Sequence, residues 1–216
     1  MLLVFDWDGT LADSTATIVD CMQRAAQDTG MPVRAADAIC HIIGLGLPEA
    51  IAALYPATTS VCREAIRSAY VQHFVAEDRG PTLLFPGVRD TLHALFAAGH
   101  TLAVATGKSR RGLQRALHGL NDIAGLFSAT RCADETQSKP HPQMLWELLD
   151  ELAVDANHAV MVGDTHYDME MAARAGIARI GVSYGAHAVA ALQAFDPLAC
   201  VDRFVDIVPI IEQWQE

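Results

Sequence analysis

The chain has 216 residues, of which 51% are hydrophobic and 19% are charged, a composition typical of a well-buried globular protein and not of a disordered one. Its formal net charge of −11 disfavours binding to nucleic acid or to an anionic membrane surface, since both require a basic protein face. No apolar run approaches the ~20 residues of a membrane span, and five scattered cysteines give no disulfide framework, so we expect a soluble cytoplasmic protein.

The chain begins with a short apolar run at residues 2–5, which predicts a buried strand that ends at a glycine-containing turn. From Ser14 the apolar residues recur at helical spacing, and helical segments continue to about Arg79 without strand-like alternation. Glycines interrupt this block at residues 44–48, and Gly80-Pro81 ends it. The first strand is therefore followed by an all-helical insertion.

After residue 86, helices and strands alternate along the chain. The predicted strands are residues 101–105, 127–133, 159–162 and 178–182, with helices between them and a mixed tail at the end. Such alternation predicts an α/β fold with a doubly wound, Rossmann-like parallel sheet. We expect a catalytic core made of residues 1–13 and 82–216, and an inserted helical cap domain of residues 14–81 that is hinged to it.

Three predicted strands end directly at reactive residues, namely Asp6, Thr106 and Asp164. In open α/β sheets, ligands bind beyond the carboxyl ends of the strands. Because these ends meet at one edge of a parallel sheet, the sequence predicts that the three side chains share one site.

Aspartates crowd this predicted site. They are Asp6, Asp8, Asp164 and Asp168, the last of which lies one helical turn after the third. Like-charge repulsion forbids four ionised carboxylates in one crevice unless cations are added. Oxygen ligands with several waters suit Mg²⁺ best, and Lys139 supplies a further positive charge.

Lysine is scarce, because Lys108 and Lys139 are the only two in the chain and every other fixed cation is arginine. Lys139, which precedes a proline, is read as a functional residue. Lys108 is open to two interpretations, a solvated loop residue or a second cation that faces the substrate.

Four segments together resemble the motifs of the haloacid dehalogenase-like superfamily, in the same order along the chain. They are Asp6-Trp7-Asp8-Gly9-Thr10-Leu11, Thr106-Gly107, Lys139-Pro140 and Gly163-Asp164-Thr165-His166-Tyr167-Asp168. The helical block resembles the alpha-helical cap of this superfamily. Within it, the chain is most similar to phosphoglycolate phosphatase-type enzymes.

The resemblance implies a Mg²⁺-dependent phosphatase that acts on a small phosphorylated metabolite. Asp6 would be the nucleophile that becomes a phosphoaspartate, and Asp8 the general acid and base. Thr106, Gly107 and Lys139 would hold the phosphate oxygens, with Lys108 as a further candidate. The implied metal ligands are Asp6, Asp8, Asp164 and Asp168, and Asp168 is alternatively expected to orient Lys139.

Several alternatives stay open on the sequence. A phosphosugar mutase of the beta-phosphoglucomutase kind shares these motifs, as do nucleotide and sugar-phosphate phosphatases of the same superfamily. A phosphate-sensing receiver domain also uses strand-end aspartate, threonine and lysine, but it lacks the helical insertion. Residues 44–47 are either a helix break or a loop that faces the substrate, and His141 and His166 flank the site without an assigned role.

Overall fold

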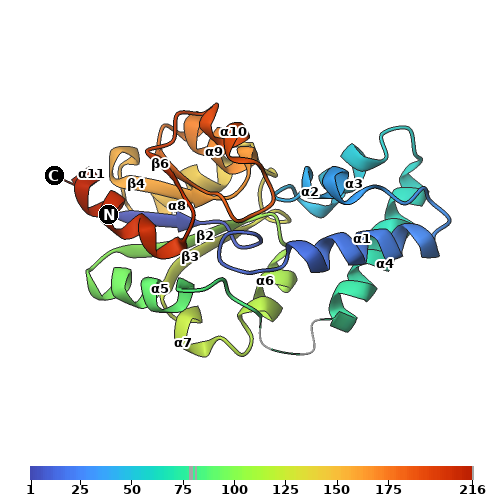
Figure 1. The fold of residues 1–216 in the computed structure, drawn as a ribbon, viewed down its shortest axis with the longest axis horizontal. Coiled ribbons are helices and arrows are strands. Elements are labelled where there is room, and N and C mark those ends of the chain that lie inside the picture. Colours follow the sequence, from blue (N-terminus) through green and yellow to red (C-terminus); the bar gives the residue numbers. More distant parts are fainter. Residues whose placement is uncertain (78–79, 81, 216) are drawn as a thin grey trace.

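A six-stranded sheet forms the centre of the computed structural model, which describes residues 1–77, 80 and 82–215 (Figure 1). Its strands are β1 (Leu2–Phe5), β2 (Thr101–Thr106), β3 (Phe127–Cys132), β4 (Ala159–Gly163), β5 (Ala178–Val182) and β6 (Ala199–Val201). They lie in the order β3-β2-β1-β4-β5-β6, and every neighbouring pair is parallel. The winding direction reverses between β1 and β4, where doubly wound sheets bind their ligands. The predicted fold class is confirmed.

Helices cover both faces of the sheet because its strands bury both sets of side chains. In β1, Leu3 and Phe5 belong to one apolar cluster, and Leu2 and Val4 belong to the other. The first cluster is completed by α5 (Val88–Ala97), α6 (Arg110–Leu117), α7 (Asn121–Ala124) and α11 (Ile207–Gln215). The second is completed by α8 (Gln143–Glu151) and α9 (His166–Ala175), while α10 (Val189–Gln193) contacts β5 and β6. Short 3-10 turns cover Ala156–His158 and Phe204–Asp206.

A block of helices lies beyond one end of the sheet (Figure 1). It contains α1 (Thr15–Asp28), α2 (Ala36–Cys40), α3 (Leu47–Leu54) and α4 (Ser60–Glu77). The block has an apolar core of its own, in which Met22, Ile51 and Ile66 are almost fully buried. The described residues of the segment that was predicted to be helical contain no strand. The proposed boundary at residues 81 and 82 stays a prediction, and Pro81 lies outside the described residues.

The two chain segments that join the block to the sheet run side by side. The backbone N–H of Asp13 donates to the carbonyl of Leu83 at 2.9 Å, and the N–H of Phe85 donates to the carbonyl of Leu11 at 3.0 Å. Ala12 and Leu84 form an antiparallel bridge between these bonds. The covalent connections between block and sheet therefore pass through one narrow joint.

The last part of the chain is more regular than the mixed tail that was expected. It adds β6 at the edge of the sheet and α11 against the cluster that contains Phe5. The strand has only three residues, too few for period-2 alternation to reveal it. Among the described helices, none combines the length and hydrophobicity that crossing a bilayer requires.

Candidate active site

Three buried polar residues mark the carboxyl ends of neighbouring strands. Asp6 follows β1, Thr106 ends β2 and Asp164 follows β4, and each is at most 1% exposed. The backbone N–H of Asp6 donates to the carbonyl of Val162 at 2.9 Å, which continues the pairing of β1 with β4 beyond the end of β1. The sheet thus brings together the three residues that the sequence placed at strand ends.

Lys139 connects two of the buried carboxylates. Its Nζ lies 2.6 Å from Oδ1 of Asp6 and 2.6 Å from Oδ1 of Asp168. The lysine comes from the loop between β3 and α8, and its side chain is fully buried. Burial by itself would lower the pKa of Lys139, but the charges of Asp168 and Asp6 outweigh burial and raise it. The ammonium group is therefore a fixed positive charge in the centre of the site.

Asp164 is held by two donors from distant parts of the chain. The hydroxyl of Thr10 donates to Oδ1 at 2.9 Å, and the backbone N–H of Ala186 donates to Oδ2 at 2.7 Å. Gly9 and Gly185 pack so closely that a Cβ on either would lie 2.2 Å from an Asp164 side-chain atom. Gly9 also has a φ of +82°, which favours glycine. Glycine at both positions is what lets these loops close around the carboxylate.

Asp168 has both carboxylate oxygens engaged by protein donors. Oδ1 accepts the bond from Lys139, while Oδ2 accepts from the backbone N–H and the hydroxyl of Thr165 at 3.0 and 2.7 Å. The Thr165 hydroxyl in turn accepts from the Asp168 N–H, which completes a capping box at the start of α9. Of the two roles considered for Asp168, the hydrogen bonds favour the orientation of Lys139.

The buried charges do not balance among themselves. One oxygen from each of Asp6, Asp164 and Asp168 lies within 4.8 Å of the other two, with Lys139 as the cation hydrogen-bonded to two of them. Burial and the neighbouring carboxylates raise the pKa of Asp6 well above its ordinary value, although Lys139 opposes this. Burial and Asp168 likewise raise the pKa of Asp164 to about 7. Either protons or a further cation must neutralise this cluster.

The donor set fits Mg²⁺. Oδ2 of Asp6 is buried and has no hydrogen-bond partner among the described residues, which is costly for a carboxylate oxygen. The oxygens that converge here are hard ligands of the kind that Mg²⁺ prefers. Asp6 keeps one oxygen without a donor, and each oxygen of Asp164 accepts a single neutral donor, whereas Asp168 is engaged by the Lys139 ammonium and by two donors of Thr165. Asp6 and Asp164 therefore have the greater freedom to bind the ion.

The carboxylate of Asp8 lies outside this cluster of three, and its place among the metal ligands stays a prediction. Its Oδ1 accepts a hydrogen bond from the Ser14 hydroxyl at 2.6 Å and lies 3.0 Å from Nζ of Lys108. The physical reason is local, because the chain turns sharply after Asp6 and carries Asp8 toward the loop that follows β2. Lys108 also lies over the ring of Phe74 at 4.7 Å from its centroid, so it is not a solvated loop residue.

Thr106 and Gly107 end β2 beside the helical block. The Thr106 hydroxyl accepts from the backbone N–H of Lys108 at 3.1 Å. A Cβ on Gly107 would lie 2.5 Å from the carbonyl oxygen of Leu45 and 2.7 Å from that of Gly44. The loop of the block therefore packs directly on this strand end, and only glycine leaves it enough room.

A cavity of about 290 Å³ opens between the helical block and the strand ends. Asp6, Asp8 and Lys108 line its inner end. The block contributes an apolar wall that consists mainly of Ile18, Met22, Ile43, Leu45, Tyr70 and Phe74. Charged side chains at the wall include Glu49, Arg67 and Arg115. Of residues 44–47, for which two interpretations were open, Gly44, Leu45 and Leu47 line this cavity.

Several residues of the site carried no signal of their own in the sequence. Ala186 acts through its backbone N–H, which any residue except proline could supply. The sequence pattern marks Ser14 only as the start of a helix, and His41 and His187 lie outside the four motifs. His141, which the sequence places beside the site without an assigned role, lies edge-on to Trp146 and accepts the N–H of Gln143.

Known proteins resemble this chain over most of its length. A family model described as haloacid dehalogenase-like hydrolase matches residues 3–182. The chain is 36% identical to "Probable phosphatase IndB" of Dickeya dadantii, over 96% of this chain and 91% of that protein. It is 32% identical to a phosphoglycolate phosphatase of Pectobacterium atrosepticum, over 97% and 91%. A crystal structure titled "predicted phosphoglycolate phosphatase" from Haemophilus somnus superposes with a TM-score of 0.84 at 28% identity, covering 97% of this chain and 96% of that one.

Proposed function

The chain belongs to the haloacid dehalogenase-like hydrolase family, and from this premise we propose that it hydrolyses small phosphomonoesters through a phosphorylated Asp6. The observation that carries this proposal is the unpartnered Oδ2 of Asp6, buried beside Lys139 at the inner end of the cavity. A carboxylate nucleophile divides a difficult hydrolysis into two displacements. The relatives are named as phosphatases, which supports the same reaction class.

In the first displacement, the free oxygen of Asp6 attacks phosphorus, and the bond from phosphorus to the ester oxygen breaks. Asp8 donates a proton to the leaving alkoxide, and in the second displacement it accepts a proton from the attacking water. Water then releases phosphate and regenerates the carboxylate of Asp6. The pairing of Asp8 with Lys108 and Ser14 fixes its position for both proton transfers.

Positive charge and N–H donors stabilise the transferring group. We assign Lys139, the hydroxyl of Thr106 and the N–H of Gly107 to the phosphate oxygens, because Nζ of Lys139 lies 2.6 Å from Asp6 and the other two lie at the end of the neighbouring strand β2. Asp6 and Asp164 would hold Mg²⁺, with Asp168 orienting Lys139. When bound, Mg²⁺ supplies positive charge that offsets both the carboxylates and the incoming phosphate.

The cavity favours a particular class of ester. Its wall from the helical block is mainly apolar, so the part of the substrate that is not phosphate would be largely apolar or aromatic. Phosphoglycolate is the substrate in the names of several relatives, and it would need a cation for its carboxylate. Arg67 and Arg115 are the candidates at the wall, and Arg67 already pairs with Glu64 at 2.6 Å.

A panel of esters tests both the reaction and the substrate class. Phosphate release from phosphoglycolate, a sugar phosphate, a nucleoside monophosphate and an aromatic phosphate would be measured with Mg²⁺ and with chelator. We expect Mg²⁺-dependent release, with the highest kcat/KM for the ester that has the largest apolar group. Phosphate transfer between sugar positions without net release would instead assign a mutase. We propose that the reaction takes place in the cytoplasm, a reducing compartment that suits the five free cysteines.

A further inference from the structure

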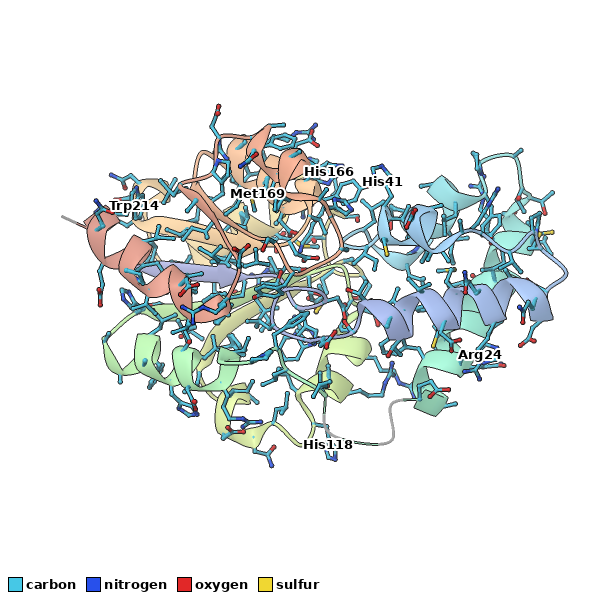
Figure 2. The ribbon with its side chains drawn as sticks, in the orientation of Figure 1. Arg24, His41, His118, His166, Met169 and Trp214 are labelled. Atoms are coloured by element: carbon cyan, nitrogen blue, oxygen red, sulfur yellow. The ribbon has the colours of Figure 1, made fainter. Side chains whose placement is uncertain are left out.

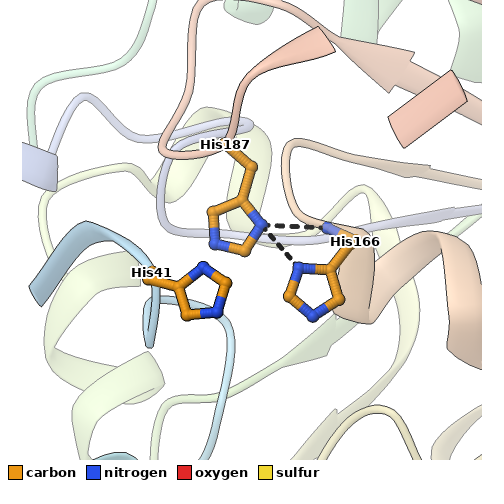
Figure 3. A group of neighbouring side chains, drawn as sticks. All are labelled: His41, His166 and His187. Atoms are coloured by element: carbon orange, nitrogen blue, oxygen red, sulfur yellow. Dashed lines mark hydrogen bonds between the residues drawn. The ribbon is translucent and has the colours of Figure 1, made fainter. Parts of the chain in front are cut away.

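Three histidines from separate segments gather beside the active site but outside its carboxylate cluster. His41 follows α2 in the helical block and His166 is the first residue of α9 (Figure 2). His187 lies between β5 and α10. One ring nitrogen of each lies within 4.8 Å of the other two. The rings of His41 and His166 both lie next to that of His187 (Figure 3).

His187 is the buried member of this histidine cluster, with 7% of its surface exposed. Its Nδ1 accepts the backbone N–H of His166 at 3.1 Å and lies 2.9 Å from Nδ1 of the same residue. An accepting Nδ1 places the proton of the neutral ring on Nε2, which is buried with no hydrogen-bond partner among the described residues. Burial lowers the pKa of this ring and the backbone of Cys40 tends to raise it, but Nε2 makes no hydrogen bond of normal geometry among the described residues.

Few bonds tie the three rings to one another. Among the described residues, one hydrogen bond joins two of the three rings, between Nδ1 of His166 and Nδ1 of His187. Imidazole nitrogens gathered in this way are the commonest protein ligands of metal ions.

We propose that His41, His166 and His187 bind a divalent transition-metal ion of the zinc class. Imidazole nitrogen suits Zn²⁺, Co²⁺ and Ni²⁺, whereas Mg²⁺ prefers the oxygens of the carboxylate cluster. Three histidines with a water in the fourth position are a ligand set that tetrahedral Zn²⁺ accepts. This site would be distinct from that of Mg²⁺ because its donor chemistry is different.

Binding requires local movement of the rings, and Nδ1 of His187 must give up the bond that it accepts from the backbone N–H of His166. Zn–N bonds of about 2.0–2.1 Å place the nitrogens of a tetrahedral ion roughly 3.3 Å apart, against a present separation of at most 4.8 Å. The rings of His166 and His187 are now stacked at 23°, so they must turn about their Cβ–Cγ bonds to direct both lone pairs at one centre. The proton between the two Nδ1 atoms moves to the outer nitrogen of His166, and no net proton is released.

The position of this site gives the ion a structural effect. His41 belongs to the helical block, while the other two histidines belong to the core. The two parts are already joined here, because the hydroxyl of Tyr167 donates to the carbonyl of His41 at 3.1 Å. Residue 41 also leads into the loop of residues 44–47 that lines the cavity. A bound ion would therefore tie this loop to the core and slow its opening.

Metal binding is the direct test, and it does not depend on the proposed catalytic activity. The full chain would be saturated with Mg²⁺ and titrated with Co²⁺, whose visible spectrum reports tetrahedral nitrogen coordination, and with Zn²⁺ in equilibrium dialysis. We expect the wild-type chain to retain Zn²⁺ in excess Mg²⁺, and His41→Ala and His187→Gln to weaken binding at least about tenfold. His41 is exposed, so its replacement leaves the fold intact.

The matched control is His118→Ala, an exposed histidine that lies away from the cluster in Figure 2 and should leave Zn²⁺ binding unchanged. Absence of Zn²⁺ retention by the wild-type chain would overturn the proposal, as would equal retention by the cluster variants and the control. Hydrogen exchange tests the bridge itself. Zn²⁺ should slow exchange at residues 41–47 in the wild-type chain and not in His41→Ala, and unchanged exchange with Zn²⁺ bound would refute the bridging role.

Discussion

Nζ of Lys108 lies 3.0 Å from Oδ1 of Asp8, so that the loop after β2 is paired with the loop after β1. The side chains are only 11% and 13% exposed. The same lysine lies over the ring of Phe74 in α4, which connects the proposed acid and base residue to the helical block. Lys108 therefore couples the position of Asp8 to the position of the block, a role distinct from that of Lys139.

Replacement of Lys108 should cause a moderate loss of catalytic efficiency. Lys108→Ala leaves Asp8 with the Ser14 hydroxyl alone, and loss of an ion pair near the surface is worth about 1 kcal/mol. We expect kcat/KM to fall about fivefold, with Lys108→Arg recovering part of it. Steady-state kinetics on the best ester of the panel would measure this. If Lys108→Ala lost as much kcat/KM as Lys139→Ala, Lys108 would contact the reacting phosphate directly.

Replacement of Lys139 should damage both stability and activity. Lys139→Ala leaves Asp6 and Asp168 buried without their cation, which typically costs about 3–5 kcal/mol in the free energy of unfolding. Lys139→Arg should not restore turnover, because a planar guanidinium does not fit where a compact ammonium bridges two carboxylates. Urea unfolding and kcat would be measured together, with Lys108→Ala for comparison, since that lysine pairs with one carboxylate and not with two. Full activity in Lys139→Arg would contradict this role.

Substitution of the two aspartates after β1 should impair different steps of the reaction. Asp6→Asn removes the nucleophile, so turnover and any trapped phosphoenzyme should both disappear. Asp8→Asn keeps the nucleophile but removes the proton donor, so kcat should fall by ~10²–10⁴-fold while phosphate still binds. Acid-quench trapping of the phosphoenzyme with a labelled ester distinguishes the two variants. If Asp6→Asn kept more than a few per cent of wild-type kcat, another residue would have to be the nucleophile.

Removal of Mg²⁺ should abolish activity and lower stability, and the change in stability should depend on pH because the buried carboxylates titrate. Chelator should abolish hydrolysis, and Mg²⁺ should restore it. The pKa of Asp164 is about 7 in the metal-free fold, against an ordinary value of 3.8, so its contribution to stability is full below about pH 4 and is lost as pH rises through 7. Mg²⁺ binds the ionised form and should therefore raise Tm more at pH 8 than at pH 5.

Thermal unfolding with Mg²⁺ and with chelator at both pH values measures that difference. Asp164→Asn is the internal control, since it removes the titrating group and should make the effect of Mg²⁺ on Tm small at either pH. An equal rise in Tm at pH 5 and pH 8 in the wild-type chain would show that Mg²⁺ does not compete with protons at this cluster.

The contact between Gly107 and the helical block should control closure of the cavity. In Gly107→Ala the new Cβ would lie 2.5 Å from the carbonyl of Leu45, so the loop of residues 44–47 must move away from the strand end. We expect a higher KM and a changed ranking of esters, with Tm reduced by only a few degrees. Gly125→Ala is the matched control, because a Cβ there meets nothing within 4 Å. Equal kinetics in the two variants would mean that this contact does not set substrate choice.

Periodicity and strand-end chemistry were enough to predict the sheet, the helical insertion and the meeting of Asp6, Thr106 and Asp164. These features depend on local patterns, because the buried strands of a parallel sheet are short apolar runs and their carboxyl ends share one edge. The bounds of the elements also agreed within a few residues. For example, β4 ends at Gly163 where the pattern indicated residue 162, and β3 ends at Cys132 where residue 133 was expected.

Only the tertiary structure decided which charges pair. Asp8 and Asp6 are two residues apart, yet one meets Lys108 and the other Lys139, because the turn between them directs the two carboxylates to different loops. The backbone N–H that holds Asp164 belongs to Ala186, a residue whose type carries no information about that bond. The histidine cluster joins residues up to 146 positions apart, as His41 and His187 are. Contacts of this kind depend on how the packed elements are placed, which no local spacing encodes.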